Sequence, residues 1–248
     1  MLDLKGVSRS FGGVRAVSGL DLTVGEKEIV GLIGPNGSGK STTVNLITGL
    51  VPLSAGVVYL HGKDIGPLPT YRRLHAGIAR TFQNIRLFGQ LTVWQNLWVA
   101  QNSPEERARR GFFARWLGGQ SAARAEIEEL LAFSGLAHKR NELASNLAFG
   151  EQRRLELARA LAAKPKLLLL DEPAAGMNSE EIGLLRARIL GLRERGMTIL
   201  LIEHVMELVM GVADRIAVLN FGVKIAEGPP AEIQSDPLVR SAYLGGGA

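Results

Sequence analysis

Residues 34–41 read Gly34-Pro35-Asn36-Gly37-Ser38-Gly39-Lys40-Ser41, which matches the pattern G-x-x-x-x-G-K-[ST]. Glycines in such a loop let backbone N–H groups converge on phosphate oxygens, and the helix that follows points the positive end of its dipole at the same anion. We expect Lys40 to reach the β- and γ-phosphates of a nucleotide and Ser41 to hold Mg²⁺. A glycine-rich turn could match this pattern by chance, so the flanking segments have to decide.

The segments on both sides of this loop supply the context that a phosphate-binding loop requires. The apolar run at 28–33 predicts a buried strand that enters the loop, and residues 41–50 have the spacing of a helix that leaves it. Apolar runs at 167–170 and 198–202 predict two more buried strands. Strands that alternate with helices are typical of an α/β core with a parallel sheet, in which ligands bind at the carboxyl ends of the strands.

The remaining segments predict two additions to this core. Alternation of apolar and polar residues at 2–8 and 20–24, with a hairpin at 56–62, predicts a group of short strands. Residues 85 to about 163 are mostly helical in pattern, with a glycine- and arginine-containing interruption at 103–119. They predict an inserted helical subdomain.

The last third of the chain predicts further helices and a hairpin. Asn178 and Glu181 have the spacing of a capping box and predict a helix that continues to about Arg195. Residues 214–227 predict a hairpin, and residues 230–244 predict one terminal helix.

The amino-acid composition limits which classes of protein the chain can belong to. The chain has 248 residues, of which 46% are hydrophobic and 21% charged, and it contains no cysteine. We expect a globular protein with one large domain, and structural disulfides, thiolate metal sites and a cysteine nucleophile are excluded. No apolar run approaches the roughly 20 residues of a membrane-spanning helix, and the first residues lack the order of a signal peptide. We therefore expect the protein to stay in the cytoplasm.

The formal net charge is +5. A basic balance is typical of proteins that meet nucleic acid, an anionic ligand or an anionic membrane surface. Basic and aromatic residues are interleaved in Arg107-Ala108-Arg109-Arg110-Gly111-Phe112-Phe113-Ala114-Arg115-Trp116. For this stretch we favour a solvated insertion with a small aromatic core. Contact with a membrane surface or permease, and stacking on nucleic acid, are the alternatives.

Asp171 and Glu172 follow the apolar run at 167–170. A carboxylate at such a strand end can hold the Mg²⁺ shell, commonly through water, and its neighbour can orient and polarise an attacking water. A solvated acidic pair would be the better interpretation if the pair stood alone. Because a phosphate-binding loop precedes the pair in the same chain, we assign Asp171 to Mg²⁺ and Glu172 to the water.

At this point the chain resembles the ATP-binding subunits of ABC transporters over nearly its whole length. The motifs occur in the family's order and spacing: Gly34–Ser41, Gln83, Leu147-Ala148-Phe149-Gly150-Glu151-Gln152-Arg153-Arg154, Leu167–Pro173 and His204. The resemblance implies an α/β fold with a RecA-like P-loop core, an N-terminal antiparallel β subdomain and an inserted α-helical subdomain. Residues 1–248 would then form a single ATP-binding domain, with the core at about 1–84 and 164–248 and the helical subdomain at about 85–163.

The resemblance implies roles that the residues alone do not. Phe11 is similar to the aromatic residue that stacks on adenine, although a core residue at a strand end is the usual interpretation. Gln83 resembles the loop glutamine that senses Mg²⁺ and water, and His204 resembles the switch histidine that contacts the γ-phosphate. Thr42 and Glu151 join the nucleotide-binding residues. The implied cofactors are ATP and Mg²⁺, with Lys40, Glu172 and His204 in catalytic roles and Ser41, Gln83 and Asp171 at the metal.

The signature segment departs from the common Leu-Ser-Gly-Gly-Gln form. Ala148 replaces the serine and has no hydroxyl for the γ-phosphate, and Phe149 replaces the first glycine. Gly150 and the amide-rich start of the following helix can still contact a nucleotide that a second subunit holds. Ala148, Gly150 and Glu151 are therefore expected at a composite site, and the departure bears on the affinity of the closed dimer.

The signature variant also narrows the resemblance to one branch, the larger ATP-binding subunit of branched-chain (hydrophobic) amino acid importers. The residues that carry this are Gln83–Phe88, Asn146–Gly150, Asp171–Asn178 and Leu238–Gly245, whereas Val205 replaces the acid usual after the histidine. The resemblance implies a peripheral ATPase on the cytoplasmic face of the membrane. Its partners would be a second ATP-binding subunit (a copy or a paralogue), transmembrane permease subunits and, indirectly, a solute-binding protein. Residues near Ile85, Leu87, Phe88 and Trp94 would face the permease.

Two other classes remain as alternatives. A non-transport ABC-type ATPase that acts on DNA or ribosomes usually has a long coiled-coil insert or tandem ATPase halves, and neither fits 248 residues. A P-loop GTPase needs a guanine-reading Asn-Lys-x-Asp, which the sequence lacks. We therefore expect no nucleic acid partner, and the sequence does not name the solute.

Overall fold

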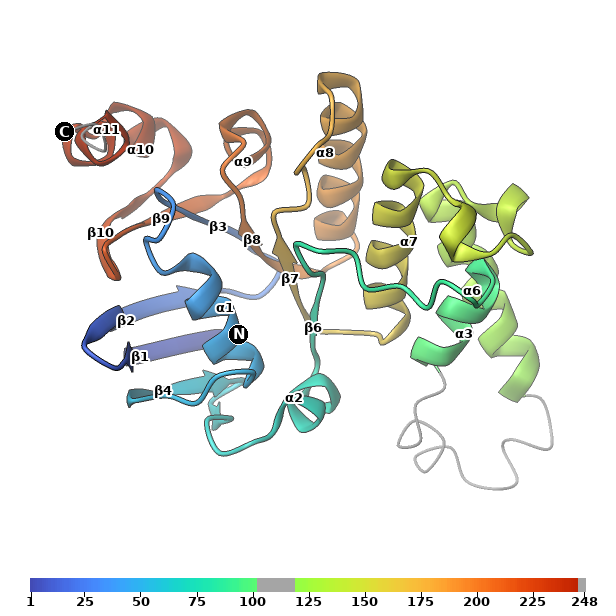
Figure 1. Cartoon of the computed structure of the whole chain (residues 1–248), viewed down its shortest axis with the longest axis horizontal. Coiled ribbons are helices and arrows are strands. Elements are labelled where there is room, and N and C mark those ends of the chain that lie inside the picture. Colours follow the sequence, from blue (N-terminus) through green and yellow to red (C-terminus); the bar gives the residue numbers. More distant parts are fainter. Residues whose placement is uncertain (102–118, 245–248) are drawn as a thin grey trace. The chain divides into compact units, whose positions relative to one another are not determined.

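The computed structural model of the protein describes residues 1–101 and 119–244 (Figure 1). The chain divides into two compact units, Met1–Arg80 with Lys166–Ala248, and Thr81–Pro165. These limits lie a few residues outside the predicted helical subdomain at 85–163. The basic and aromatic stretch at 107–116 falls outside the described residues.

The larger unit is built on a six-stranded sheet with the order β10-β9-β3-β8-β7-β6. The strands from β9 to β6 are parallel, and β10 pairs antiparallel with β9. Every residue of β3, β7 and β8 is buried, which explains their continuous apolar sequences. The predicted parallel core is therefore confirmed. The strands are β3 Ile29–Ile33, β6 Ile78–Arg80, β7 Leu167–Asp171, β8 Thr198–Ile202, β9 Arg215–Asn220 and β10 Val223–Gly228.

A second, antiparallel sheet has four strands in the order β2-β1-β4-β5. These strands are β1 Leu2–Phe11, β2 Val14–Val24, β4 Ala55–Leu60 and β5 Lys63–Asp64. β1 and β2 are longer than the predicted strands, because register shifts along their pairing interrupt the alternation that the sequence pattern relies on. The predicted N-terminal antiparallel subdomain is confirmed.

One hydrophobic core joins the two sheets through helix α1 (Lys40–Thr48). Figure 1 shows α1 beside the antiparallel strands, and its buried side chains Val44, Leu46 and Ile47 belong to this core. The core also takes residues from both sheets: Leu4, Leu22, Val58, Leu169, Leu200 and Leu219. Because α1 begins immediately after the phosphate-binding loop, this packing positions the loop against both sheets.

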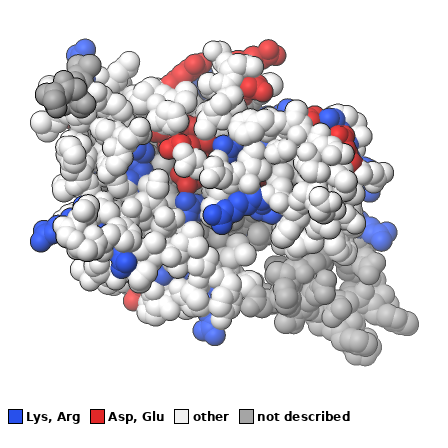
Figure 2. Space-filling model, viewed as in Figure 1, with Lys and Arg blue, Asp and Glu red and all other residues white. Residues whose placement is uncertain are grey.

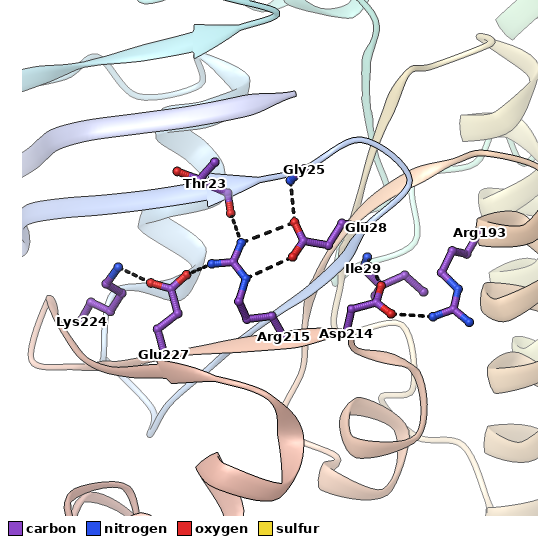
Figure 3. Close-up of polar contacts among 9 residues, drawn as sticks. All are labelled: Thr23, Gly25, Glu28, Ile29, Arg193, Asp214, Arg215, Lys224 and Glu227. Carbon is purple, nitrogen blue, oxygen red and sulfur yellow. Dashed lines mark hydrogen bonds and ion pairs between the residues drawn. The ribbon is translucent and has the colours of Figure 1, made fainter.

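Hydrogen bonds and ion pairs around Arg215 also join strands of the two sheets (Figure 3). The Arg215 guanidinium donates to the Thr23 carbonyl at 2.7 Å, to Glu28 Oε1 at 3.1 Å and to Glu227. Arg215 thus links β9 to β2 and β10. Hydrogen bonding to Glu28, the largest cause, raises the pKa of Arg215 further above its ordinary value. Each nitrogen of the guanidinium has a hydrogen-bond partner, so we interpret these contacts as structural.

The other helices of this unit are α2 (Thr70–Ala76), α8 (Ser179–Glu194), α9 (Met206–Val212), α10 (Pro230–Ser235) and α11 (Pro237–Leu244). The prediction of one terminal helix at 230–244 is wrong. Asp236 is extended with ψ 122°, because the ring of Pro237 disfavours the helical conformation in the residue before it. The chain therefore stops one helix and starts another.

The capping box predicted at the start of α8 is confirmed. Asn178 Oδ1 accepts from the Glu181 N–H, and Glu181 Oε2 accepts from the Asn178 N–H, both at 3.0 Å. We expect Asn178→Ala to destabilise the protein by about 1 kcal/mol, because the Glu181 N–H loses the side-chain oxygen that accepts from it. Thermal unfolding should show a Tm lower by about 2–4 °C. Ser179→Ala, which leaves both bonds intact, is the control, and equal Tm values for the two variants would contradict the role of the box.

The smaller unit is helical, as predicted. Among its described residues, the helices are α3 (Val93–Gln101), α6 (Gly119–Ser134) and α7 (Phe149–Ala162), and they enclose a core that includes Val93, Leu97, Ile127, Leu131 and Leu155. Within residues 1–101 and 119–244, no helix is both long and apolar enough to span a membrane.

Candidate functional site

The phosphate-binding loop joins the end of β3 to the start of α1. Gly34 has φ 149°, and a Cβ there would lie 2.1 Å from the Leu219 carbonyl oxygen. Gly39 has φ 105°, and a Cβ there would lie 2.5 Å from the Ala16 carbonyl oxygen. Only glycine fits at these two places, because β9 on one side and β2 on the other press against the backbone.

The start of α1 fits an anion. No side chain caps the N-terminus of the helix, so its first N–H groups can donate to a bound anion. The Lys40 side chain is buried, and its Nζ donates to the carbonyl oxygens of Gly34 at 2.7 Å and Pro35 at 2.9 Å. Burial lowers the pKa of Lys40, and the charges of Glu172 and Asp171 oppose that shift. A phosphate at this end of α1 would give the buried ammonium an anionic partner.

Asp171 ends β7 and is buried. Its Oδ2 lies 2.6 Å from Arg80 Nη2, and the Arg80 Nη1 donates to Asn45 Oδ1 at 2.6 Å. Arg80 therefore links the acid at the end of β7 to helix α1. The sequence analysis did not identify Arg80, because it lies on the three-residue strand β6, which is too short to show any periodicity.

Glu172 and His204 lie close together at the ends of the neighbouring strands β7 and β8. The Glu172 Oε2 is 3.9 Å from His204 Nδ1, and the two side chains are 17% and 54% exposed. Glu172 has φ 48°, which is uncommon for a residue with a side chain, and its N–H donates to the Ile202 carbonyl at 2.8 Å. Such backbone conformations persist where the surroundings hold them, and they gather at functional sites.

Three of the predicted site groups therefore come together in the larger unit: the loop 34–41 with Lys40, the pair Asp171 and Glu172, and His204. Serine and carboxylate oxygens are ligands that Mg²⁺ prefers, so Ser41 and Asp171 suit the metal that accompanies a nucleotide. Phe11, at the end of β1, is 45% exposed, and the Arg9 guanidinium lies 4.7 Å from its ring centre. Its stacking on adenine stays a prediction, as does the contact of Thr42 with phosphate.

Gln83 belongs to the helical unit, where helix α7 holds its loop. Arg153 donates to the carbonyl oxygens of Phe82 at 3.0 Å and Gln83 at 2.7 Å. Glu156 Oε1 accepts the N–H groups of Phe82 and Arg86, each at 3.3 Å, and burial raises the pKa of Glu156. The loop of Gln83 and the helix that follows the signature segment are thus one hydrogen-bonded assembly. The contact of Gln83 with Mg²⁺ stays a prediction.

The signature segment forms the start of α7. Ala148 is its N-cap, and Glu151 Oε2 accepts from the Ala148 N–H at 3.0 Å and from Lys139 Nζ at 2.8 Å. The hydrogen bond with Lys139 is the largest of the causes that lower the pKa of Glu151. Only this half of a capping box forms, because alanine has no side-chain acceptor. The roles of Gly150 and its neighbours toward a nucleotide stay predictions.

We expect Ala148→Ser to complete this box. Ala148 already has the extended backbone of an N-cap, with φ −60° and ψ 155°, so a serine hydroxyl would accept from the third residue of the helix. The variant should be more stable by about 0.5–1 kcal/mol in thermal or urea unfolding. Ala163→Ser at the other end of α7 is the control. A variant no more stable than the wild type would show that the segment does not act as a cap.

Two models of known protein families match this chain. The family model described as ABC transporter matches residues 17–175. The model described as branched-chain amino acid ATP-binding cassette transporter matches residues 223–248. The first match contains the phosphate-binding loop, the signature segment and the pair Asp171 and Glu172, and the second covers β10, α10 and α11.

Full-length relatives and a solved structure also match this chain. The high-affinity branched-chain amino acid transport ATP-binding protein LivG of Escherichia coli is 44% identical, over 99% of this chain and 98% of its own. BraF of Pseudomonas aeruginosa, which carries the same description, is 42% identical with the same coverage. A crystal structure of the ADP conformation of an ATP-binding cassette of an ABC transporter has 32% identity and a TM-score of 0.86, and the match covers 99% of this chain and 98% of that one.

Proposed function

The chain belongs to the ABC transporter family of ATP-binding subunits, and we propose that it powers a membrane importer of branched-chain or other hydrophobic amino acids. The proposal is supported above all by how the predicted site residues are arranged in the larger unit. The phosphate-binding loop, the acids Asp171 and Glu172, and His204 meet at the carboxyl ends of β3, β7 and β8. LivG and BraF, which match over the full length, are both described as branched-chain amino acid transport ATP-binding proteins. The match at 223–248 supports the branched-chain subgroup.

The chemistry follows from the positions of the side chains. When bound, ATP brings the phosphoryl group that is cleaved, and Mg²⁺ neutralises charge on its oxygens. Lys40 and the first amides of α1 would hold the phosphates, and Ser41 and Asp171 would hold the metal, commonly through water. Glu172 would orient a water molecule and accept its proton, since its carboxylate lies at the end of β7, 3.9 Å from His204 Nδ1. His204 contacts the terminal phosphate from the end of β8.

We propose that the site is completed by a second ATP-binding subunit. In this arrangement, Ala148, Gly150 and Glu151 of one chain contact the nucleotide that the other chain holds. The start of α7 suits this role because the N-cap Ala148 has no side-chain oxygen to occupy the amide N–H groups of the first turn. Closure of the pair brings the signature segment to the phosphates, and hydrolysis lets the pair open.

Transmembrane permease subunits are the other proposed partners. Phe88 is 50% exposed on the helical unit, and Trp94 packs on Trp98 with ring centres 5.0 Å apart. Aromatic residues are enriched at protein contact surfaces. We propose that this region meets the permease, which places the subunit at the cytoplasmic face of the membrane.

Transport is favoured over a role on nucleic acid, because the relatives that match with 42% and 44% identity are described as transport proteins. On the face shown in Figure 2, the described Lys and Arg side chains lie in several separate places, with uncharged residues between them.

The experiment that tests this function is isolation of the tagged chain from membranes in mild detergent, followed by mass spectrometry. The expected result is co-isolation of permease subunits and a second ATP-binding subunit. An untagged strain processed in parallel is the control. Co-isolation of nucleic acid or ribosomes without any membrane protein would support the alternative, a non-transport ATPase.

A further inference from the structure

Glu203, directly before His204, is a buried carboxylate that the chemistry above does not use. It has no solvent exposure. Its Oε1 accepts the Ala174 N–H at 2.8 Å, and its Oε2 accepts the N–H groups of His204 at 2.7 Å and Val205 at 2.9 Å. A buried carboxylate is costly unless it is hydrogen-bonded, and bonds to a charged acceptor are stronger than neutral ones. These contacts hold the carboxylate in place and fix the amides that it accepts from.

The two sides of this carboxylate belong to two different loops of the site. Ala174 lies in the loop after β7, two positions beyond Glu172, whereas His204 and Val205 form the turn after β8. The loops are also joined by the Glu172 N–H, which donates to the Ile202 carbonyl at 2.8 Å. Glu203 is thus a bridge between the loop of the proposed general base and the turn of the switch histidine.

The bridge also bears on the orientation of the imidazole. His204 Nδ1 is 3.5 Å from Glu203 Oε2 and 3.9 Å from Glu172 Oε2. Both carboxylates thus lie within 3.9 Å of the same ring nitrogen of His204. The positive φ of Glu172, 48°, is a conformation that needs such support from its surroundings.

We propose that Glu203 is a positioning residue for ATP hydrolysis, which sets the placement of Glu172 and His204 relative to each other through the amides of both loops. This inference rests on the proposed ATPase function. Glu203 itself touches neither nucleotide nor water. A carboxylate is required because the groups around it are N–H donors. In a glutamine side chain, the NH2 group would replace one of the two acceptor oxygens. It would meet a backbone N–H of one loop, and that loop would lose its hydrogen bond to residue 203.

The test compares Glu203→Gln with Glu207→Gln, which changes an exposed acid on α9, in the assembled transporter. Turnover at saturating Mg·ATP and the Kd for Mg·ATP are measured separately, together with hydrogen exchange of the backbone amides. For Glu203→Gln we expect kcat to fall on the order of tenfold to a hundredfold, because misplacement of reacting groups acts on the chemical step. The Kd should change by less than about twofold, since phosphate contacts are intact. The amides of Ala174, His204 or Val205 should exchange faster than in the control.

Two results would overturn the inference. One is a folded Glu203→Gln protein whose kcat stays within about twofold of the wild type. The other is a loss of kcat that matches the fraction of unfolded protein, which would show a purely structural role. Should Glu203→Gln not fold, Glu203→Asp provides the same test, because it keeps the charge but is one methylene too short to reach both loops. A wild-type protein that does not hydrolyse ATP would count against the proposed function instead.

Discussion

Glu172→Gln is expected to bind Mg·ATP as the wild type does and to lose nearly all turnover. Glutamine keeps the size and the backbone conformation of the residue, and it removes only the ability to accept a proton. General bases contribute about 10²- to 10⁴-fold to rate, so steady-state hydrolysis should fall by that range. The measurement is phosphate release at saturating Mg·ATP, together with the Kd from equilibrium binding.

The matched control is Glu180→Gln, an exposed acid in the first turn of α8. It should hydrolyse ATP at the wild-type rate. If Glu172→Gln also turned over at the wild-type rate, Glu172 would not be the general base. The acid that activates water would then have to be sought elsewhere.

Lys40→Ala is expected to abolish tight nucleotide binding. The ammonium is buried, and its pKa is lowered by that burial, so a bound phosphate would be its principal charge partner. Removal of one member of a buried, hydrogen-bonded charge pair costs about 2–5 kcal/mol, which corresponds to a Kd roughly 30- to several thousand-fold weaker. The measurement is a titration with a fluorescent ATP analogue at fixed Mg²⁺.

Lys63→Ala, which removes an exposed lysine of β5, should bind with the wild-type Kd. Thermal unfolding of both variants separates a lost contact from a lost fold. A Kd within about threefold of the wild type for a folded Lys40→Ala protein would remove Lys40 from the phosphate site.

The sequence predicts this fold well where a pattern has a direct physical cause. Strands β3, β7 and β8 are buried on both faces, so each is a continuous apolar run that ends at a turn or a charge. The capping box at Asn178 is likewise a local feature, because it lies within the four residues 178–181. The same holds for the phosphate-binding loop, whose glycines are required by carbonyl oxygens that press on it.

Features that depend on contacts between distant segments were not predicted. Strand β6 has three residues and is a strand only because it pairs with β7. Arg80 on that strand meets Asp171, which is 91 positions away. Glu203 resembles an ordinary polar residue before a histidine, and its hydrogen bond with the Ala174 N–H joins positions 29 residues apart. The break at Pro237 is different, because the restriction of the residue before a proline could have been read from the sequence.

The most direct measurement is uptake of radiolabelled leucine into proteoliposomes that contain the co-isolated transporter, its solute-binding protein and ATP. ATP must be supplied on the side of the membrane that the nucleotide-binding subunits face. The wild-type complex should accumulate leucine only when Mg·ATP is present, and the complex with Glu172→Gln should assemble but accumulate none. Equal accumulation with Glu172→Gln, or ATP hydrolysis by the wild-type complex without uptake of any hydrophobic amino acid, would contradict the proposed function.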